Sequence, residues 1–175
     1  ASPEFRFTSQ AADTGFSVPA GAERFSFSRG GTVLLERRKI VTGERVTNAQ
    51  SSFDEYSRPQ VNINLDTRGG RLMADATRDS VGRQMAVLFV ENKQRLRYET
   101  DAEGKAVEIR EPYIERRVIN VATVQSMLGS QFRITGLDSP AEAQELALLL
   151  RAGALAAPMY FVEERTIGPS LGQDN

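Results

Sequence analysis

Hydrophobic and polar residues alternate most regularly over residues 60–66, where aliphatic side chains are separated by polar ones. A period of two residues is typical of a strand that buries one face. Residues 84–90 form a continuous apolar run with polar flanks, which indicates a central strand. Between the two, residues 71–81 place apolar side chains at helical spacing, and Gly82 follows as a residue that commonly ends helices. The pattern predicts strand, helix and strand, with residues 67–70 as a turn.

Shorter segments on either side are compatible with β-structure. Arg29, Gly30 and Gly31 predict the tip of a hairpin between residues 25–27 and 32–35, because paired glycines allow the positive φ of a tight turn. Further strands are predicted at residues 45–53, 95–100, 106–110, 118–122 and 132–136, and a second hairpin tip at residues 101–104. Residues 124–128 are predicted to form a helical turn or a loop that ends at Gly129.

The clearest helix start is at Ser139. Its hydroxyl can cap the amide of Glu142, the Glu142 carboxylate can reach back, and Pro140 occupies the first turn, where its missing N–H costs nothing. We expect this helix to end at Gly153 and a strand to follow at residues 159–162. Many short strands with few helices predict an α+β fold with mixed or antiparallel sheets.

The beginning of the chain gives a weaker pattern. Residues 1–5 resemble a cloning scar and are left out of the fold prediction. Residues 6–39 are rich in Ser, Gly and Ala and predict no architecture beyond the hairpin. The longest apolar stretch, residues 146–162, contains Arg151 and Pro158, which favour a helix followed by a strand over a membrane span.

Composition removes many kinds of chemistry. The chain has no Cys and no His, which excludes thiol nucleophiles, disulfides, most zinc sites and the commonest general base. Its formal net charge is −1, with acidic and basic residues interspersed, unlike the basic surface of a nucleic-acid-binding protein. We expect no nucleic-acid partner, no cofactor and no enzymatic activity.

The remaining candidate groups have simpler structural interpretations. Neighbouring residues on a strand point to opposite faces, so adjacent acids do not form a catalytic pair. The glycine-containing loops lack the Lys and Ser or Thr of a phosphate-binding loop, and the aspartates lack calcium-loop spacing. These groups are Asp54 with Glu55, Glu163 with Glu164, the loops at residues 29–31 and 67–70, and Asp66, Asp75 and Asp79. No catalytic or metal-binding residue is predicted.

Several segments occur in an order that resembles the large first periplasmic domain of SecD, a family of bacterial protein-export subunits. The similar segments are residues 40–49, 59–66, 86–91, 132–136, 150–155 and 162–172, together with Gly70 and Gly82. The match is nearly continuous from Ile40 onward and loose over residues 6–39. The order of many segments, rather than any single motif, makes the resemblance specific.

The resemblance implies a domain made of a projecting head and a base of ferredoxin-like type, both α+β. On that pattern residues 40–131 form the head subdomain and residues 132–169 form part of the base. Residues 170–175 would approach a membrane span that the chain lacks. We therefore expect a fragment of a multi-pass membrane protein, without the spans that couple the family to the proton gradient.

The resemblance also implies a non-enzymatic role in protein export. In the intact protein the domain would lie at the periplasmic face of the bacterial inner membrane, work with SecF and the SecYEG channel, and capture unfolded polypeptide as it emerges. Weak, sequence-tolerant capture is possible through main-chain pairing to a strand edge and shallow apolar contacts. The alternative is a structural scaffold that docks other translocase subunits without touching the substrate. The sequence identifies no substrate-binding residue.

A head that swings relative to a base requires joints that bend. Each of the two predicted joints contains a glycine, which can absorb a change in φ and ψ. The candidate hinge residues are Ile40, Val41, Thr42, Gly43, Ile134, Thr135, Gly136, Leu137 and Asp138.

Overall fold

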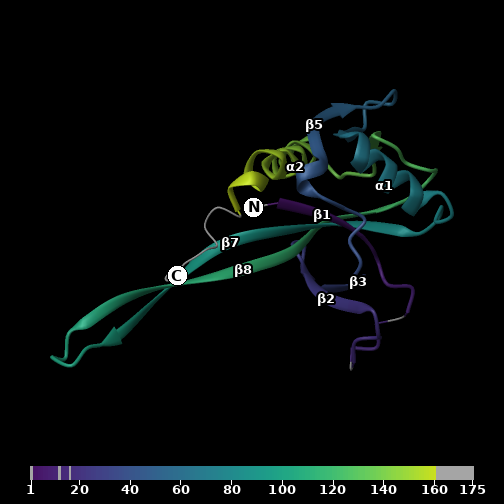
Figure 1. The fold of residues 1–175 in the computed structure, drawn as a ribbon. Helices are drawn as coiled ribbons and strands as arrows, with labels where there is room; N and C mark the ends of the chain where they lie inside the picture. The colour runs from purple at the N-terminus through teal and green to yellow at the C-terminus, as the bar shows by residue number, and fades with distance from the viewer. Residues whose placement is uncertain (1, 12, 16, 161–175) are drawn as a thin grey trace.

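The computed structural model of the chain describes residues 2–11, 13–15 and 17–160, with side chains as far as residue 152. It confirms an α+β fold with few helices (Figure 1). The strands are β1 (Ser2–Phe7), β2 (Ala22–Phe27), β3 (Thr32–Glu36), β4 (Val41–Thr42), β5 (Val46–Phe53), β6 (Pro59–Leu65), β7 (Gln84–Thr100), β8 (Ala106–Thr123) and β9 (Gln131–Ile134). The helices are α1 (Thr67–Thr77) and α2 (Pro140–Tyr160), and Gly43–Arg45 form one 3₁₀ turn.

Six strands form the larger sheet, in the order β3-β2-β8-β7-β1-β4. Strands β2 and β8 are parallel, and the other neighbours are antiparallel. Strands β7 and β8 continue well beyond their neighbours as a two-stranded ribbon that projects from the body (Figure 1). We call residues 91–116 the arm.

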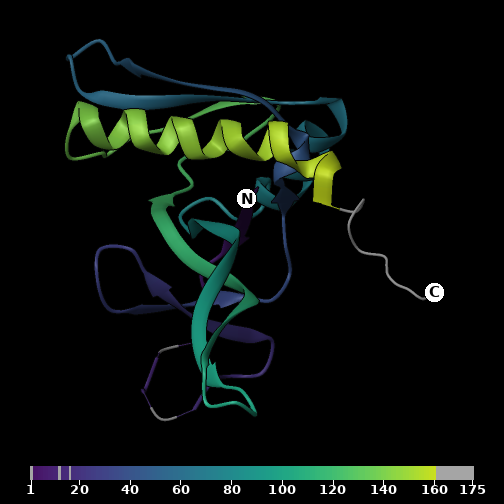
Figure 2. The same ribbon diagram turned by 90° about the vertical axis from the view of Figure 1, so that its left-hand side faces the viewer.

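Three strands form the smaller sheet, in the order β5-β6-β9. Helix α2 lies alongside this sheet (Figure 2) and buries Ala143, Leu146, Ala147 and Leu150. The main core lies between α2, one face of the smaller sheet and one face of the larger sheet. Burial of these apolar faces is the main force that holds the two sheets together.

A second, smaller apolar cluster lies on the opposite face of the larger sheet. Its buried members are Phe25, Leu35, Ala86, Leu88 and Val118. The predicted hairpin at residues 25–35 is confirmed, since β2 and β3 pair antiparallel around a turn with positive φ at Gly30 and Gly31. The hairpin supplies the apolar side chains that cover this face.

Residues 2–5 belong to the fold, although they were left out of the fold prediction as part of a cloning scar. They lie in β1, which pairs with β7 on one side and with β4 on the other. Phe5 is fully buried, and Phe7 joins it in the main core. On the opposite face of β1, Arg6 pairs with Glu4 at 2.9 Å. The segment has no clear periodicity because both of its faces are covered.

Helix α1 begins four residues earlier than predicted. Asp66 is its N-cap, and its carboxylate accepts a hydrogen bond from Gly69 N–H at 2.7 Å, so residues 67–70 are the first helical turn rather than a loop. The helix ends at Thr77, and Gly82 lies in the turn that follows it. Of the two alternatives predicted for residues 124–128, a helical turn or a loop, the structure has the loop.

Helix α2 also differs from the prediction at its end. The cap is confirmed, since Ser139 Oγ accepts from Glu142 N–H at 3.1 Å, whereas the Glu142 carboxylate accepts from Asp138 N–H at 2.7 Å. The helix passes through Gly153 and continues to Tyr160. The strand predicted from Met159 onward is therefore wrong over its first two residues, and its other two lie outside the described part.

The predicted boundary between a head and a base at residue 131 crosses a continuous structure. Strand β9 pairs with β6, and α2 packs against β5 and β6, so residues on both sides of the boundary share one core. The division stays a prediction. Within the described residues, neither helix has the length and apolar content needed to cross a bilayer.

Candidate functional site

The acidic candidates from the sequence have structural roles. Asp54 accepts hydrogen bonds from the N–H groups of Tyr56 and Arg58 in the turn between β5 and β6, and the bond from Arg58 is the largest cause of its lowered pKa. The Gly69 N–H, followed by the Arg45 guanidinium, holds the pKa of Asp66 below its usual value. Glu163 and Glu164 lie outside the described residues. No group of three potential metal ligands occurs in the described part of the chain.

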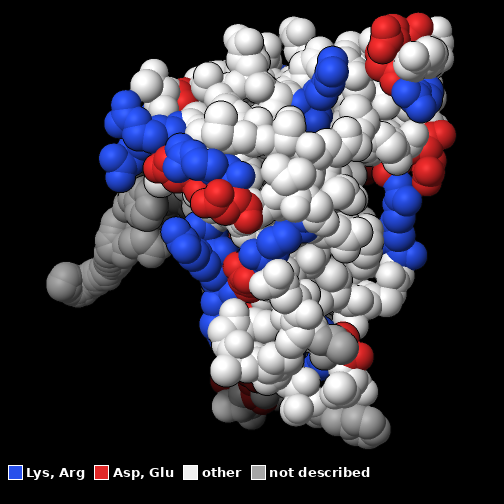
Figure 3. Space-filling model, turned by 90° about the vertical axis from the view of Figure 1, so that its right-hand side faces the viewer, with Lys and Arg blue, Asp and Glu red and all other residues white. Residues whose placement is uncertain are grey.

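The glycine-containing loops also form structural contacts. Arg29, at the tip of the β2–β3 hairpin, forms ion pairs with Asp138 and with Glu142 at the start of α2. On the face shown in Figure 3, Lys and Arg side chains lie beside Asp and Glu rather than in a patch of one sign. A broad polyanion-binding surface is not visible on this face.

The predicted hinge segments differ in how firmly they are held. Ile40 and Val41 are buried, the Ile40 N–H donates to the Phe5 carbonyl at 2.7 Å, and a Cβ on Gly43 would lie 2.6 Å from the Pro3 ring. The other hinge residue of this segment, Thr42, pairs with β1.

The second hinge segment is less enclosed. Ile134 and Leu137 are buried and fix its two sides, whereas Thr135, Gly136 and Asp138 are exposed. Gly136 has a φ of 76° and open space around its Cα, so its conformation depends on glycine rather than on packing. This segment has more freedom to bend than the first.

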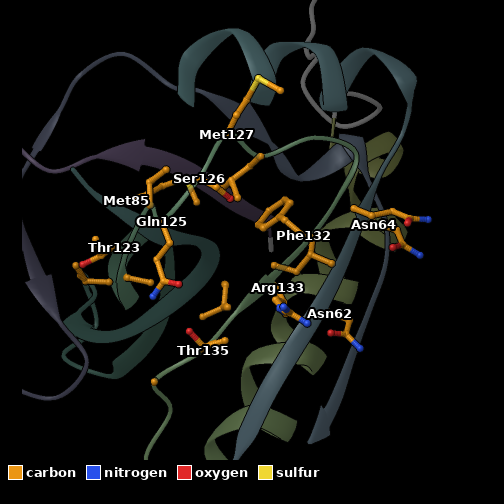
Figure 4. Close-up of a pocket in the computed structure, with 18 of the residues that line it drawn as sticks. Asn62, Asn64, Met85, Thr123, Gln125, Ser126, Met127, Phe132, Arg133 and Thr135 are labelled. Carbon is orange, nitrogen blue, oxygen red and sulfur yellow. The ribbon is translucent and has the colours of Figure 1, made fainter. Parts of the chain in front are cut away.

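A groove of about 910 Å³ runs beside β9 (Figure 4). One wall is the end of β8 and the loop after it, residues 121–128. Residues 131–136 form the other wall, and Gln50, residues 62–64 and Met85 complete the lining. The groove is thus made from segments that are far apart in the sequence.

The loop wall is anchored at both ends. Val124 exchanges backbone hydrogen bonds with the turn before β7, donating to Arg83 and accepting from Gly82, each at 2.8 Å. Leu128 N–H donates to the buried hydroxyl of Thr77 at 2.9 Å, and that hydroxyl donates to the Met73 carbonyl at 2.8 Å. These bonds fix the loop to the body without any regular secondary structure.

Strand β9 is positioned by close packing at its start. A Cβ on Gly70 would lie 2.6 Å from Ser130 Cβ and 2.8 Å from Ser130 Cα, so only glycine allows this approach of α1 to the chain that enters β9. Leu65 N–H donates to the Ser130 carbonyl at 2.7 Å. Phe132 then packs edge-on against Phe5, with ring centroids 6.0 Å apart. The glycine in α1 thus sets the position of one groove wall.

One edge of β9 is open to the groove. Strand β6 lies on one side of β9, and within the described residues no strand lies on the other. In an antiparallel pair, residues alternate between those whose N–H and C=O face the partner and those whose groups face away. Since the Ser130 carbonyl faces β6, the backbone groups of Gln131 and Arg133 face the groove. An unpaired edge of this kind is a template for another strand.

The groove lining contains almost no charged side chains. Phe132, Met85 and Val124 belong to or pack against the main core, whereas Asn62 and Asn64 are amides. Arg133 is the one charged residue of the lining, and no ion pair to its guanidinium occurs in the described part of the chain. Such a surface offers main-chain hydrogen bonds and apolar contact without strong selection of one sequence.

The sequence analysis did not identify this site. It predicted the strand at residues 132–136 but gave no sign that the strand lies at a sheet edge. The only local signal is the alternation of Gln131, Phe132, Arg133 and Ile134, with large apolar side chains at every second position. For the other wall a strand followed by a helical turn or a loop was predicted, without any sign that it faces residues 132–136.

The arm carries a second unusual surface. By the register of β7 and β8, Leu96, Tyr98 and Ile114 lie on one face, and they are 53%, 66% and 54% exposed. The same face also holds the ion pair of Arg110 with Glu108 at 3.2 Å. On the other face lie the ion pairs of Lys93 with Glu115 at 2.7 Å, Arg97 with Glu99 at 2.7 Å and Arg97 with Glu111 at 3.2 Å. Both faces carry ion pairs, and the face of Leu96, Tyr98 and Ile114 presents the larger exposed apolar side chains.

Comparison with known proteins connects this fold to protein export. A family model described as "SecDF, P1 head subdomain" matches residues 21–157. The protein translocase subunit SecD of Pseudomonas aeruginosa is 57% identical over 164 residues, which cover 91% of this chain and 26% of that protein. SecD of Escherichia coli K12 is 48% identical over 176 residues, which cover 98% of this chain and 28% of that protein.

Two solved structures share the fold. A crystal structure of SecDF in a super-membrane-facing form covers 89% of this chain and 19% of that chain, with a TM-score of 0.52 at 22% identity. A structure of SecDF, titled as a membrane component that enhances protein export, covers 95% of this chain and 69% of that chain, with a TM-score of 0.51 at 21% identity.

The chain belongs to the SecDF P1 head subdomain family. Its curated relatives are SecD subunits of protein translocases, which confirms the resemblance found in the sequence. The chain spans about a quarter of the length of those relatives.

Proposed function

We propose that this chain captures extended, unfolded polypeptide during protein export and that it does so in the groove along β9. The observation that carries the proposal is the edge of β9 that no described strand covers, which faces a groove lined by amides, apolar side chains and Arg133, a cation without an ion pair among the described residues. Main-chain pairing to such an edge is independent of side-chain identity, so it suits substrates of varied sequence. Family membership supports a role in export.

The wider role follows from the relatives. We propose that the chain acts at the periplasmic face of the bacterial inner membrane as part of a SecD subunit, together with SecF and the SecYEG channel. Coupling to the proton gradient would occur only in the intact membrane protein. The capture step would then hold emerging polypeptide while the rest of the protein changes conformation.

Site-specific photocrosslinking tests the groove. Because the chain has no Cys, a single Cys at Thr135 or Gln125 can carry a benzophenone probe on either wall. Thr32→Cys, exposed on the β2–β3 hairpin, is the matched control. We expect a labelled unfolded polypeptide to crosslink from the two groove positions and only weakly from Thr32. Equal crosslinking from all three positions would contradict capture in the groove.

The apolar face of the arm favours a second candidate function, namely a scaffold that docks other translocase subunits without contacting substrate. Exposed apolar patches on soluble domains commonly mark protein contacts. A triple variant with Leu96→Thr, Tyr98→Thr and Ile114→Thr distinguishes the two. If docking is the main function, this variant loses export activity in the full-length protein while polypeptide crosslinking from Thr135 is retained.

A further inference from the structure

We infer that the groove along β9 selects extended segments whose side chains alternate between apolar and polar, with an acidic residue favoured on the polar side. This inference rests on the proposed capture function and adds a class of substrate to it. It follows from the pleat of β9, the two differently lined sides of the groove and the single charge among the lining residues.

The pleat of β9 separates two kinds of surface. Phe132 and Ile134 face the core, paired with Ile63 and Val61 of β6. The residues between them, Gln131 and Arg133, are exposed on the other face, next to Asn64 and Asn62. A strand added at the open edge continues the same pleat, because paired residues in a sheet share a face.

The two sides of such a strand meet different chemistry. On the core side its side chains approach Phe132, Met85 and Val124, which are apolar. On the other side they approach Gln131 and Arg133, and Asn62 of β6 lies next to Arg133 (Figure 4). A segment with period-two alternation places polar side chains beside Gln131 and Arg133 and apolar ones on the core side, whereas a uniformly apolar segment covers these two polar side chains without offering them partners. Burying polar groups without partners is unfavourable.

Arg133 adds a preference for negatively charged side chains in the bound segment. No carboxylate is among the residues that line the groove, and the guanidinium has no ion pair within the described residues. An acidic side chain directly across from Arg133 gains a favourable cross-strand pair, and a basic one meets a like charge. Because the site is exposed, this preference weakens as salt is added, while the preference for alternation does not.

Fluorescence anisotropy with three labelled peptides of nine residues tests the inference on the full chain. The first alternates Val with Glu and Thr, the second has the same composition with its Val residues in one block, and the third replaces Glu by Lys. We expect the first to bind about tenfold more tightly than the second, and about three- to fivefold more tightly than the third at low salt. Arg133→Glu should reverse the order of the first and third, whereas Arg38→Glu, on an exposed residue outside the groove, should not.

The outcomes separate the inference from the proposed function. If the first and second peptides bind equally well, the inference of alternation is overturned but capture in the groove stands. If Arg133→Glu leaves the preference for Glu over Lys unchanged, the role of Arg133 is overturned. If none of the peptides binds, capture in this groove and the inference both fail.

Discussion

The N–H of Leu128 donates to Thr77 Oγ1 at 2.9 Å across a separation of 51 residues, and the Thr77 side chain is completely buried. This bond connects α1 to the loop wall of the groove. The same hydroxyl donates to the Met73 carbonyl, so it acts as both donor and acceptor.

Thr77→Val keeps the shape of the side chain and removes this acceptor. The Leu128 N–H then loses its partner, and we expect a loss of about 1–3 kcal/mol in the free energy of unfolding. Urea denaturation measures the loss. Thr77→Ser retains the hydroxyl and should recover a large part of it, and Thr67→Val, at an exposed position, is expected to change stability by no more than about 0.5 kcal/mol. A neutral Thr77→Val would contradict the anchoring role.

Gly70→Ala tests the packing between α1 and Ser130. Alanine is the better helix former, so in an open position the change would stabilise by about 1 kcal/mol. Here the new Cβ overlaps the backbone of Ser130, and we expect a net destabilisation of about 1–3 kcal/mol. Peptide binding in the groove should weaken as well, because β9 must shift.

Gly129→Ala is the control for this change, since a Cβ at Gly129 meets no atom within 4 Å. It should leave both the urea midpoint and peptide binding nearly unchanged. If the two glycine variants behave alike, close approach at Ser130 is not the reason for the glycine in α1.

Asp66 predicts a dependence of stability on acid pH. Its folded pKa is lowered from the ordinary value of 3.8 by the Gly69 N–H and by Arg45. The ionised carboxylate therefore stabilises the fold above pH 3.8, and this contribution is lost as the pH falls through the lower, folded pKa. Asp66→Asn keeps a capping group but has no charge to lose.

The comparison to make is the unfolding free energy of the wild type and Asp66→Asn between about pH 7 and pH 2. We expect the wild type to be more stable at neutral pH by about 0.3–1 kcal/mol, the usual size of a charge effect at a helix N-terminus. The difference should disappear at the acid end. A constant difference across the range would show that the Asp66 charge does not contribute.

The hinge proposal can be tested between Arg29 and Asp138, whose side chains form an ion pair at 3.1 Å. Cysteines at these two positions, joined by a short crosslinker, would tie the β2–β3 hairpin to the residue after Gly136. We expect the crosslinked domain to remain folded and the full-length protein to lose its stimulation of export. Export that is equally efficient before and after crosslinking would show that this segment does not need to bend.

The sequence predicted those elements whose signals are local. The alternation at residues 60–66, the acidic tip at residues 101–104 and the Ser139 cap each depend on neighbours within a few positions, and all three occur in the structure. Such features depend little on the rest of the fold.

The errors concern residues whose role depends on distant contacts. Gly70 was interpreted as part of a turn, but it is helical and is required by Ser130 in another segment. Gly153 was interpreted as a helix end, but α2 continues through it. The groove could not be predicted because its walls meet only after β6, β8 and β9 have been placed.

The position of β1 between β7 and the edge strand β4 determines the order in which the larger sheet can assemble. Residues 2–7 of β1 pair with residues 85–90 of β7. The pairing of β1 with β7 therefore closes a loop of nearly half of the chain. The hairpins β2–β3, β5–β6 and β7–β8 need only short loops and can form first, because loop-closure entropy rises with length. Until β1 is inserted, β7 and β4 present unpaired strand edges. The partly folded domain then resembles the incompletely folded chains, with exposed strand edges, that export machinery must handle.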